Sequence, residues 1–565
     1  MSKNFSLSRQ LAQALLLVAS VAACQAHAAK AVPAAAAAAA TAAQPKLVVV
    51  LVVDGLPQEQ VTRYRDQFGQ GGFRRLLEQG AWFSDAHQAH GITVTAIGHS
   101  AVLSGAYPYQ HGVIGNNWID PVTKKSVYCT EDGNFHYIGE ETKPDDGTAP
   151  TKLRVSTLGD ELRYSTGDKA KVVTVSGKDR GAILLAGKTG TAYMYMEKTG
   201  NFASSTYYMQ QHPQWVQRYQ ATRPQDRYYG KSWTPLLADS AYARDARDEL
   251  VPAKPGTRNT FPFAYYSDSG KLDGEYYSRL KSGPFLDELT LEFARAAVDG
   301  ENLGHNPAGV PDILGVSLSA HDYVNHAYGP ESKMSHDHLQ RLDRMLAGFF
   351  ADLDKKVGMD NVLVVLTADH GFANVPEFTE ARGGFSAKRI DGDKLVAALN
   401  QHLATTLGAD KLVTSSSLPN IYLDYALAEK SGVNRAALED AAARFLLQQD
   451  GLAQVYTRTQ MESGAVATRM DTLMRRAWNR QLSGDLMLVT KPAWYFGKGV
   501  GGTSHGTPYT YDTNVPLMVF GPRWIKPGAY GQYAEVVDIA PTLAHLLRIR
   551  QPSASEGRVL TEAVR

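Results

Sequence analysis

The stretch LVVVLVVDG, from Leu47 to Gly55, decides the fold class of this chain. Its first seven residues are all Leu or Val, and polar positions do not alternate with apolar ones. A strand with one solvated face would show alternating polar and apolar residues. A continuous apolar run therefore predicts a strand buried on both faces, as in a parallel sheet covered by helices. Asp54 and Gly55 follow the run directly.

Similar apolar runs recur along the chain and alternate with helical patterns. The further runs are KVVTVSG (Lys171 to Gly177), ILGVSLSA (Ile313 to Ala320), NVLVVLTA (Asn361 to Ala368) and VPLMVFG from Val515. Apolar stripes at helical spacing are Phe285, Leu289, Phe293 and Ala296, and then Leu342, Leu346, Phe349 and Leu353. Strands that alternate with helices predict an α/β fold, a doubly wound and mostly parallel sheet with helices on both faces.

The charge balance excludes several classes of partner. The 565 residues include 58 basic and 57 acidic side chains, so the chain has no excess charge that would attract nucleic acid or an anionic membrane surface. We therefore expect no nucleic-acid-binding surface.

The N-terminus has the pattern of an export signal. Lys3 and Arg9 precede the apolar run LLLVASVAA, and cleavage after Ala28 makes residues 1–28 a signal peptide. This predicts a periplasmic or secreted protein. In the alternative, Val21 to Cys24 is a lipobox, Cys24 is lipidated, and the protein is an outer-membrane lipoprotein. The apolar run falls short of the roughly 20 residues of a membrane span, so no transmembrane segment is expected in the mature chain.

The composition also indicates the domain organisation. Residues 29–45 form an Ala-rich tether, residues 46–550 the main domain and 551–565 a C-terminal tail. Insertions at about 186–284 and 376–494 are expected to cover the carboxyl edge of the sheet. Four aromatic residues of the first insertion either line the entrance to a site or pack, and packing is favoured: Tyr207, Tyr208, Trp215 and Trp233. Cys129 is the only cysteine besides Cys24, so two cysteines of the main domain cannot form a disulfide.

Polar side chains collect where the predicted strands end. In open α/β sheets ligands bind beyond the carboxyl ends of the strands. Taken singly, an Asp-Gly pair is usually a turn and a His is usually structural, as we expect for His99, His111, His136 and His545. Together, three Asp and three His suit two divalent cations, and carboxylate with imidazole favours zinc over magnesium or calcium. These residues are Asp54, Asp322, His326, Asp369, His370 and His505.

Two such ions about 4 Å apart can clamp the attacking and leaving oxygens of a phosphoryl displacement. Asp322 and His326 are spaced i, i+4, which places them on one face of a helical turn.

These segments together resemble a known family. VVDG, TAIGHS, SAHDYVNHAYGP, TADHG and SHGTPYTYDTNVPL are similar to motifs of the alkaline phosphatase superfamily, in the same order. The nearest branch is the phosphate-irrepressible bacterial alkaline phosphatases, related to nucleotide pyrophosphatase/phosphodiesterases, and the similarity runs from about Lys46 to Leu547. The resemblance implies two Zn²⁺ per chain. One would be held by Asp322, His326 and His505, and the other by Asp54, Asp369 and His370 and also by the nucleophile.

The resemblance assigns the nucleophile to Thr95 in ITVTAIGHS, with Thr93 as the rival. Ala96 to Ser104 can form one helix whose first N–H groups face an incoming phosphate. In the alternative, Thr95 is only a helix N-cap. As the nucleophile it would form a phosphothreonine that water hydrolyses to inorganic phosphate. Asn116 matches the family's asparagine that donates to a phosphoryl oxygen, although it could merely serve the turn in GNNW, with Asn117 as a substitute.

The segment SGKDRG bears on the substrate class. A phosphate monoester carries more charge than a diester and calls for extra cationic donors. Lys178 and Arg180, two residues apart at a strand end, can point the same way. In the family this Lys-x-Arg pair contacts the phosphoryl group of monoesters, whereas the diesterase branch lacks it. In the alternative, the two are a solvated basic pair.

We therefore expect an alkaline phosphatase that acts on small-molecule phosphate monoesters. A phosphodiesterase/nucleotide pyrophosphatase of the same superfamily is the alternative, and a non-enzymatic binding protein is a third. A sulfatase would need a C/S-x-P-x-R context that TAIGHS lacks. A phosphoglycerate mutase would use manganese and a serine, and would leave Lys178 and Arg180 unexplained.

Overall fold

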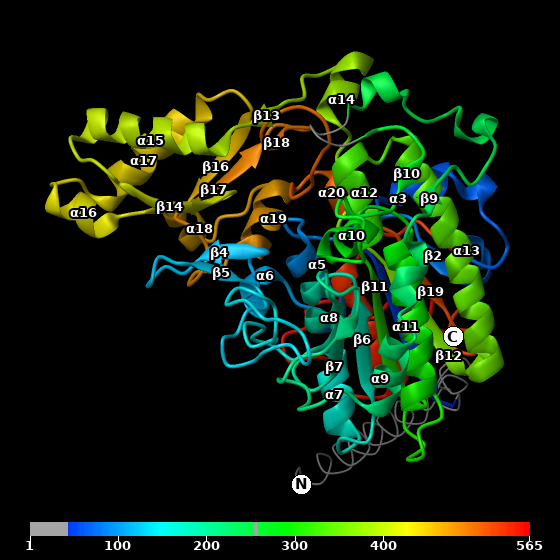
Figure 1. Ribbon diagram of the computed structural model, residues 1–565. Coiled ribbons are helices and arrows are strands. Elements are labelled where there is room, and N and C mark those ends of the chain that lie inside the picture. The colour runs from blue at the N-terminus through cyan, green and yellow to red at the C-terminus, as the bar shows by residue number, and fades with distance from the viewer. Residues whose placement is uncertain (1–42, 253–257) are drawn as a thin grey trace, which may run out of the picture. The chain divides into compact units, whose positions relative to one another are not determined.

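The central sheet of the computed structural model, which describes residues 43–252 and 258–565, has nine strands in the order β20-β2-β19-β12-β1-β11-β6-β7-β8 (Figure 1). Their bounds are β1 Leu47–Val53, β2 Ala81–Phe83, β6 Val172–Ser176, β7 Thr191–Tyr195, β8 Phe202–Ala203, β11 Asp312–Leu318, β12 Val362–Thr367, β19 Leu517–Phe520 and β20 Gly528–Tyr530. The predicted signal peptide, Cys24 and most of the predicted tether lie outside the described residues.

The middle of the sheet is parallel, as the apolar runs predict. β12, β1, β11, β6 and β7 pair in parallel, and all seven residues of β1 are buried. Two strands run in the opposite direction, because β19 is antiparallel to β12 and the edge strand β8 is antiparallel to β7. The predicted α/β fold, a doubly wound and mostly parallel sheet, is confirmed.

Helices cover both faces of the sheet (Figure 1). α11 (Phe285–Glu301) packs with α13 (Lys333–Lys356) and α9 (Gln214–Ala221) on one face. α8 (Asp179–Ala186), α5 (Thr95–Ser104) and α21 (Ile539–Leu547) cover the other. The predicted stripe of α13 is buried throughout. In α11, by contrast, Phe285 and Ala296 are partly exposed, because the buried face of that helix is broader and includes Leu286, Leu291 and Ala294.

Residues 376–494, predicted as an insertion, form a unit with a core of its own. Four strands pair in the order β14-β15-β17-β16, with α15 (Gly392–Leu407) and α17 (Arg435–Leu447) beside them at the left of Figure 1. The strand bounds are β14 Val413–Ser417, β15 Asn420–Leu423, β16 Leu452–Thr457 and β17 Leu486–Thr490. Leu399, Leu403, Leu438 and Leu446 are among the residues of its core. We call residues 376–494 the inserted unit.

The first predicted insertion begins later than about residue 186. β7 and β8 belong to the central sheet, and their sequences escaped prediction because TAYMY is aromatic rather than aliphatic. The remainder contains short elements such as η2 (Pro224–Tyr228), β9 (Ser232–Trp233), β10 (Phe263–Ala264) and α10 (Gly274–Arg279). Its aromatic residues pack: Trp215 lies 5.3 Å from the ring of Phe293, and the Trp233 indole N–H donates to Asp337 at 2.6 Å.

Residues 551–564, within the predicted tail, pack against the domain. Leu560 and Ala563 are buried, and the Glu556 N–H donates to the Gly105 carbonyl at 2.9 Å. The chain from Gln44 to Val564 therefore folds as one unit.

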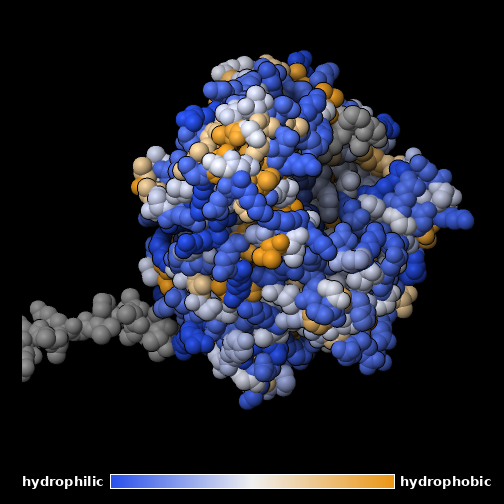
Figure 2. All heavy atoms as spheres, turned by 90° about the vertical axis from the view of Figure 1, so that its left-hand side faces the viewer, coloured by the Kyte–Doolittle hydropathy of each residue, from blue (hydrophilic) through white to orange (hydrophobic). Residues whose placement is uncertain are grey.

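The surface shown in Figure 2 is mainly hydrophilic, with hydrophobic residues in small separate areas. None of the helices in residues 43–252 and 258–565 combines the length and the apolar character needed to cross a bilayer.

Candidate active site

The register of the parallel strands brings the predicted site residues to one edge of the sheet. Val52 pairs with Thr367 and Ser317 with Ser176, so β1, β12, β11 and β6 end at similar heights. The chain then continues into Asp54, Asp369, Lys178 and the helix α12 (Ala320–Tyr328). α12 presents Asp322 and His326 one turn apart, as their spacing predicts.

The six predicted metal ligands converge at this edge. The Nε2 atoms of His326 and His505 each lie 3.5 Å from Asp322 Oδ1. His370 Nε2 lies 3.5 Å from Asp54 Oδ1, 3.5 Å from Asp369 Oδ2 and 3.9 Å from Asp322 Oδ1.

Two groups of ligand atoms have all their members within 4.8 Å of one another, and they are Asp322, His326 and His505, and Asp54, Asp322 and His370. The first matches the set that the sequence predicts. In the second, Asp322 stands where the sequence predicts Asp369, while Asp369 lies beside His370. Asp322 is thus common to both groups.

The three imidazoles are oriented as metal ligands are. Each Nδ1 lies within hydrogen-bond distance of a backbone carbonyl: His326 with Thr503 at 3.0 Å, His370 with Gly371 at 2.9 Å and His505 with Thr93 at 2.7 Å. A carbonyl oxygen only accepts, so each Nδ1 carries the proton and the Nε2 lone pair is directed at the carboxylates. This tautomer, fixed by a second partner, is the one that binds a cation.

Some carboxylate oxygens of the cluster are buried without a donor that would offset their charge. Asp54 Oδ1 and Asp322 Oδ1 have no hydrogen-bond partner among the described residues, whereas Asp54 Oδ2 lies 2.8 Å from Lys178 Nζ and Asp369 Oδ2 lies 3.1 Å from His99 Nδ1. Burial, with Asp369 and Asp322 nearby, raises the pKa of Asp54 well above its usual range. Buried carboxylates this close to one another are stable as anions only beside cations. The donor set therefore fits divalent cations.

Lys178 lies among these carboxylates. Its Nζ is 2.5 Å from Asp322 Oδ2 and 2.8 Å from Asp54 Oδ2, and it lies 4.9 Å from the centre of the Tyr323 ring. Burial alone would lower the pKa of the Lys178 ammonium, but Asp322 and Asp54 outweigh it and raise that pKa. Burial alone would also raise the pKa of Asp322, yet Lys178 and the imidazoles of His326 and His505 hold it well below its usual range.

Thr95 and Thr93 differ in what their hydroxyls contact. Thr95 is the first residue of α5, Val94 is the N-cap, and no side chain caps the helix. The Thr93 hydroxyl donates to the Thr507 carbonyl at 2.8 Å. The Thr95 hydroxyl makes no hydrogen bond within the described chain. Thr95 is therefore not the N-cap, and its hydroxyl is available where that of Thr93 is engaged.

Asn116 lies beside the start of α5. Its Oδ1 accepts the Ala96 N–H at 2.9 Å, which leaves the side-chain NH₂ as a donor next to Thr95. Asn117 is exposed and lies in the strand β4 (Asn117–Ile119).

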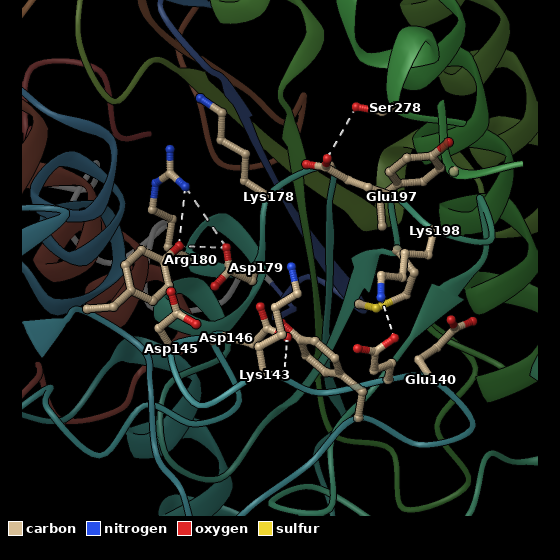
Figure 3. Close-up of a pocket in the computed structure, with 18 of the residues that line it drawn as sticks. Glu140, Lys143, Asp145, Asp146, Lys178, Asp179, Arg180, Glu197, Lys198 and Ser278 are labelled. Carbon is tan, nitrogen blue, oxygen red and sulfur yellow. Dashed lines mark hydrogen bonds and ion pairs between the residues drawn. The ribbon is translucent and has the colours of Figure 1, made fainter. Parts of the chain in front are cut away.

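Arg180 is positioned differently from the prediction. Lys178 is the N-cap of α8 and Arg180 its second residue, so the two do not share the face of a strand. Figure 3 nevertheless shows their side chains directed to the same side. The Arg180 guanidinium donates to the Tyr128 hydroxyl at 3.3 Å, and that hydroxyl donates to Asp179 at 2.7 Å.

His99 is a residue whose role sequence reasoning missed. It is fully buried, as a structural His would be, but its Nδ1 lies 3.1 Å from Asp369 Oδ2 and its Nε2 lies 2.8 Å from the Ser317 hydroxyl. It thus ties α5 to a predicted metal ligand. The available signal is its spacing of four residues from Thr95 in TAIGHS, which places both on one side of the helix.

Two cavities adjoin the cluster. The first, about 510 Å³, borders Lys178 and Arg180, and its other walls include Glu140, Asp146, Glu197 and Lys198 (Figure 3). The second, about 310 Å³, borders Asn116 and His505 and lies between the domain core and the inserted unit. Its wall contains no Asp, Glu, Lys or Arg.

Comparison with known proteins shows similarity along most of the chain. A family model described as type I phosphodiesterase / nucleotide pyrophosphatase matches residues 48–512. A protein of Myroides odoratus named calcium-transporting ATPase is 35% identical over 532 residues, which cover 92% of this chain and 95% of that protein. Alkaline phosphatase PhoV of Synechococcus elongatus is 35% identical over 531 residues, with 92% and 93% covered.

A crystal structure of alkaline phosphatase PafA matches with a TM-score of 0.85 at 32% identity, covering 93% of this chain and 100% of that chain. A second structure of PafA is a mutant in which a threonine, an asparagine, a lysine and an arginine are among the replaced residues. Those four occur in the same order and at the same sequence intervals as four residues of this chain, Thr95, Asn116, Lys178 and Arg180.

Proposed function

Since the chain belongs to the alkaline phosphatase superfamily, in the type I phosphodiesterase / nucleotide pyrophosphatase family, we propose that it hydrolyses phosphate monoesters through a phosphothreonine at Thr95. The chain is an enzyme of the alkaline phosphatase class. One observation best supports hydrolysis of monoesters through Thr95. Three carboxylates and three imidazoles oriented as metal ligands converge at the edge of the sheet that also holds Lys178.

In the proposed reaction the Thr95 hydroxyl gives its proton to solvent water, and its oxygen attacks phosphorus in line with the bond to the leaving alcohol. The P–O bond to that alcohol breaks, the alcohol leaves with a proton from water, and the phosphoryl group remains on Thr95. Water then attacks phosphorus from the side that the alcohol vacated, opposite Thr95, and loses a proton to solvent. The P–O bond to Thr95 breaks, the Thr95 oxygen regains a proton from water, and inorganic phosphate leaves. In both steps the bond to the protein is made or broken at the Thr95 hydroxyl oxygen, which is the nucleophile of this covalent mechanism.

The residues around Thr95 have separate roles in this proposal. Asn116, held by the Ala96 N–H, directs its amide at a phosphoryl oxygen. Arg180, anchored through Tyr128, supplies a second donor, and Lys178 supplies positive charge at the same edge. Two zinc ions held by Asp54, Asp322, His326, Asp369, His370 and His505 would lower the pKa of a bound hydroxyl and offset phosphoryl charge.

The substrate class is tested by steady-state kinetics on an aryl monophosphate and the matched diester, with zinc content measured on the same sample. The monoester is expected to be the better substrate, with about two zinc ions per chain. Arg180→Gln should lower the monoester rate by on the order of 10²-fold, because one donor to the phosphoryl charge is lost, while the diester rate changes little. Arg180 is the sharper choice because Lys178 also pairs with Asp54 and Asp322.

Lys198→Ala is the matched control, since Lys198 lines the same cavity but pairs with Glu141 at the surface. It should leave both rates unchanged. A wild-type enzyme faster on the diester would instead make the chain a phosphodiesterase, the alternative that the family's description favours. A protein without zinc and without turnover on either ester would overturn both.

The export prediction forms part of the same proposal. N-terminal sequencing of the mature protein from a Gram-negative host should begin at Ala29 if signal peptidase cleaves after Ala28. A blocked N-terminus at Cys24, with the protein in the membrane fraction, would favour the lipoprotein alternative.

A further inference from the structure

The cavity between the domain core and the inserted unit differs in its chemistry from the cavity beside Lys178. The apolar walls come from both parts of the domain. The core contributes Ile92, Val94 and Ile114, the inserted unit contributes Leu418 and Pro419, and Phe496 follows the inserted unit in sequence. Its polar walls are hydroxyls, amides and backbone, and His505 is its one titratable ring besides Tyr495. Transfer of an apolar group from water into such a cavity is favourable in free energy. A charged group would lose its hydration there and find no charged partner in the wall.

This uncharged cavity reaches the proposed site directly. It borders Asn116, which lies beside the start of α5, and Val94, the residue before Thr95. It also borders His505, whose Nε2 lies 3.5 Å from Asp322. A phosphoryl group at Thr95 would therefore have charged donors toward Lys178 and Arg180 (Figure 3) and an uncharged recess toward His505.

The walls of the recess are held in place by contacts between the two parts of the domain. The Ser417 hydroxyl of the inserted unit donates to the Asn117 carbonyl at 3.1 Å. The Tyr495 hydroxyl accepts from Arg389 at 2.6 Å and donates to the Gly502 carbonyl at 3.2 Å. Phe496 and Leu418 are half-buried, with one side packed on the core of the inserted unit. The recess is thus largely preformed, as small-molecule pockets usually are.

We propose that this recess binds the organic part of the leaving group, so that the enzyme prefers phosphate monoesters of aromatic or similarly apolar alcohols. The inference rests on the proposed phosphatase activity and assigns specificity to Leu418, Tyr495 and Phe496. A volume of about 310 Å³ accommodates a fused aromatic ring system and lies in the range of ligand pockets. Tyr207, Tyr208, Trp215 and Trp233, for which packing is the favoured expectation, do not line this recess.

The test compares substrates whose leaving groups have similar acidity but different apolar area. Phenyl phosphate and 2-naphthyl phosphate form such a pair, and methyl phosphate serves as a substrate that cannot fill the recess. For the wild-type enzyme, kcat/KM should be about tenfold higher for the naphthyl than for the phenyl ester. Because this comparison needs no variant, equal kcat/KM values for the two aryl esters overturn the inference.

Phe496→Ala and Leu418→Ala should each reduce the naphthyl preference severalfold and leave kcat/KM for methyl phosphate within about twofold. Phe385→Ala is the control, because Phe385 is 58% exposed and lines a different cavity. The inhibition constant of inorganic phosphate should not change in any of the three, since phosphate occupies only the phosphoryl site. If both recess variants keep the wild-type preference, the assignment is overturned.

Failure of the inference and failure of the proposed function are distinguishable. A protein that hydrolyses none of the three monoesters contradicts the function. A protein that hydrolyses all three with no dependence on apolar area keeps its function and contradicts the inference alone.

Discussion

Thr93 and Thr95 are two positions apart in the sequence, and their hydroxyls differ in hydrogen bonding. Thr93 is engaged with the Thr507 carbonyl, and its own carbonyl accepts from His505. Thr95 begins α5 next to Asn116. Sequence alone leaves both residues open, because hydrogen-bond partners more than 400 positions away decide between them.

Thr95→Ala should lower kcat by on the order of 10³-fold or more, because the attacking oxygen is removed. The zinc content should stay near two per chain, because six other ligands remain. Thr95→Ser, which keeps a hydroxyl, should retain measurable turnover. The measurement is kcat on an aryl monophosphate together with metal analysis.

Thr93→Val is the control for that substitution. It removes the hydrogen bond to Thr507 and should cost about 1–3 kcal/mol of stability while turnover persists. Loss of turnover in Thr93→Val with full activity in Thr95→Ala would reverse the assignment of the nucleophile.

Glu331 is a buried carboxyl outside the proposed site. Its Oε1 accepts the Val375 N–H at 2.8 Å, and burial raises its pKa to about 8. Between its ordinary pKa of 4.5 and about 8, the folded state holds a proton that the unfolded state releases. The contribution of Glu331 to stability is therefore present in acid and is lost as the pH rises through this window.

Glu331→Gln should abolish that loss. Its free energy of unfolding is expected to fall less than that of the wild type between pH 5 and pH 8.5, by a few kcal/mol in total. Denaturant unfolding at a series of pH values measures this. Parallel pH profiles for the two proteins would contradict the assignment.

At the scale of elements, the position of α5 is set by its close packing against the backbone that follows β12. All ten residues of α5 are buried. A Cβ on Gly98 would lie 2.1 Å from the Asp369 carbonyl oxygen, which is backbone and cannot rotate away. The helix therefore approaches the predicted metal ligand as closely as a glycine permits.

Gly98→Ala should displace α5 or Asp369 and reduce both stability and turnover. We expect a loss of about 1–3 kcal/mol, the usual cost of overpacking, and weaker zinc binding because Asp369 moves. Thermal unfolding and zinc titration measure the two effects.

Gly348→Ala is the matched control, because Gly348 also lies inside a helix but its nearest neighbour, an Arg295 nitrogen, is 3.5 Å away. Alanine there should stabilise the protein by up to about 1 kcal/mol through helix propensity. If Gly98→Ala behaved like Gly348→Ala, the close approach of α5 to Asp369 would be wrong.

For the whole molecule, bound cations should link the ends of several strands. Asp54, Asp369 and α12 come from separate parts of the chain and meet only at the sheet edge. A chelator should therefore lower the unfolding temperature and abolish turnover, and zinc should restore both. At 100 times the dissociation constant, each bound ion contributes about 2.7 kcal/mol.

Asp322→Asn is the variant that tests the site itself, because Asp322 belongs to both ligand groups. Its unfolding temperature should respond little to chelator. A wild-type protein whose unfolding temperature is unaffected by chelator would contradict the two-cation site.

The sequence by itself determined the parallel strands and the chemistry at their ends. Leu47–Val53 is apolar throughout because both of its faces are covered. Burial of this kind can therefore be predicted from the local composition alone. The types and order of Asp54, Asp322, His326, Asp369, His370 and His505 pointed to a cation site without any coordinates.

Only the tertiary structure decided which side chains contact one another. It placed Lys178 between Asp54 and Asp322, and it hydrogen-bonded Thr93 to Thr507. It also brought His99 to Asp369 and put β7 and β8 into the central sheet. It also placed the uncharged recess between the core and the inserted unit. These features depend on distances between residues far apart in the chain, and such distances are set by packing rather than by local composition.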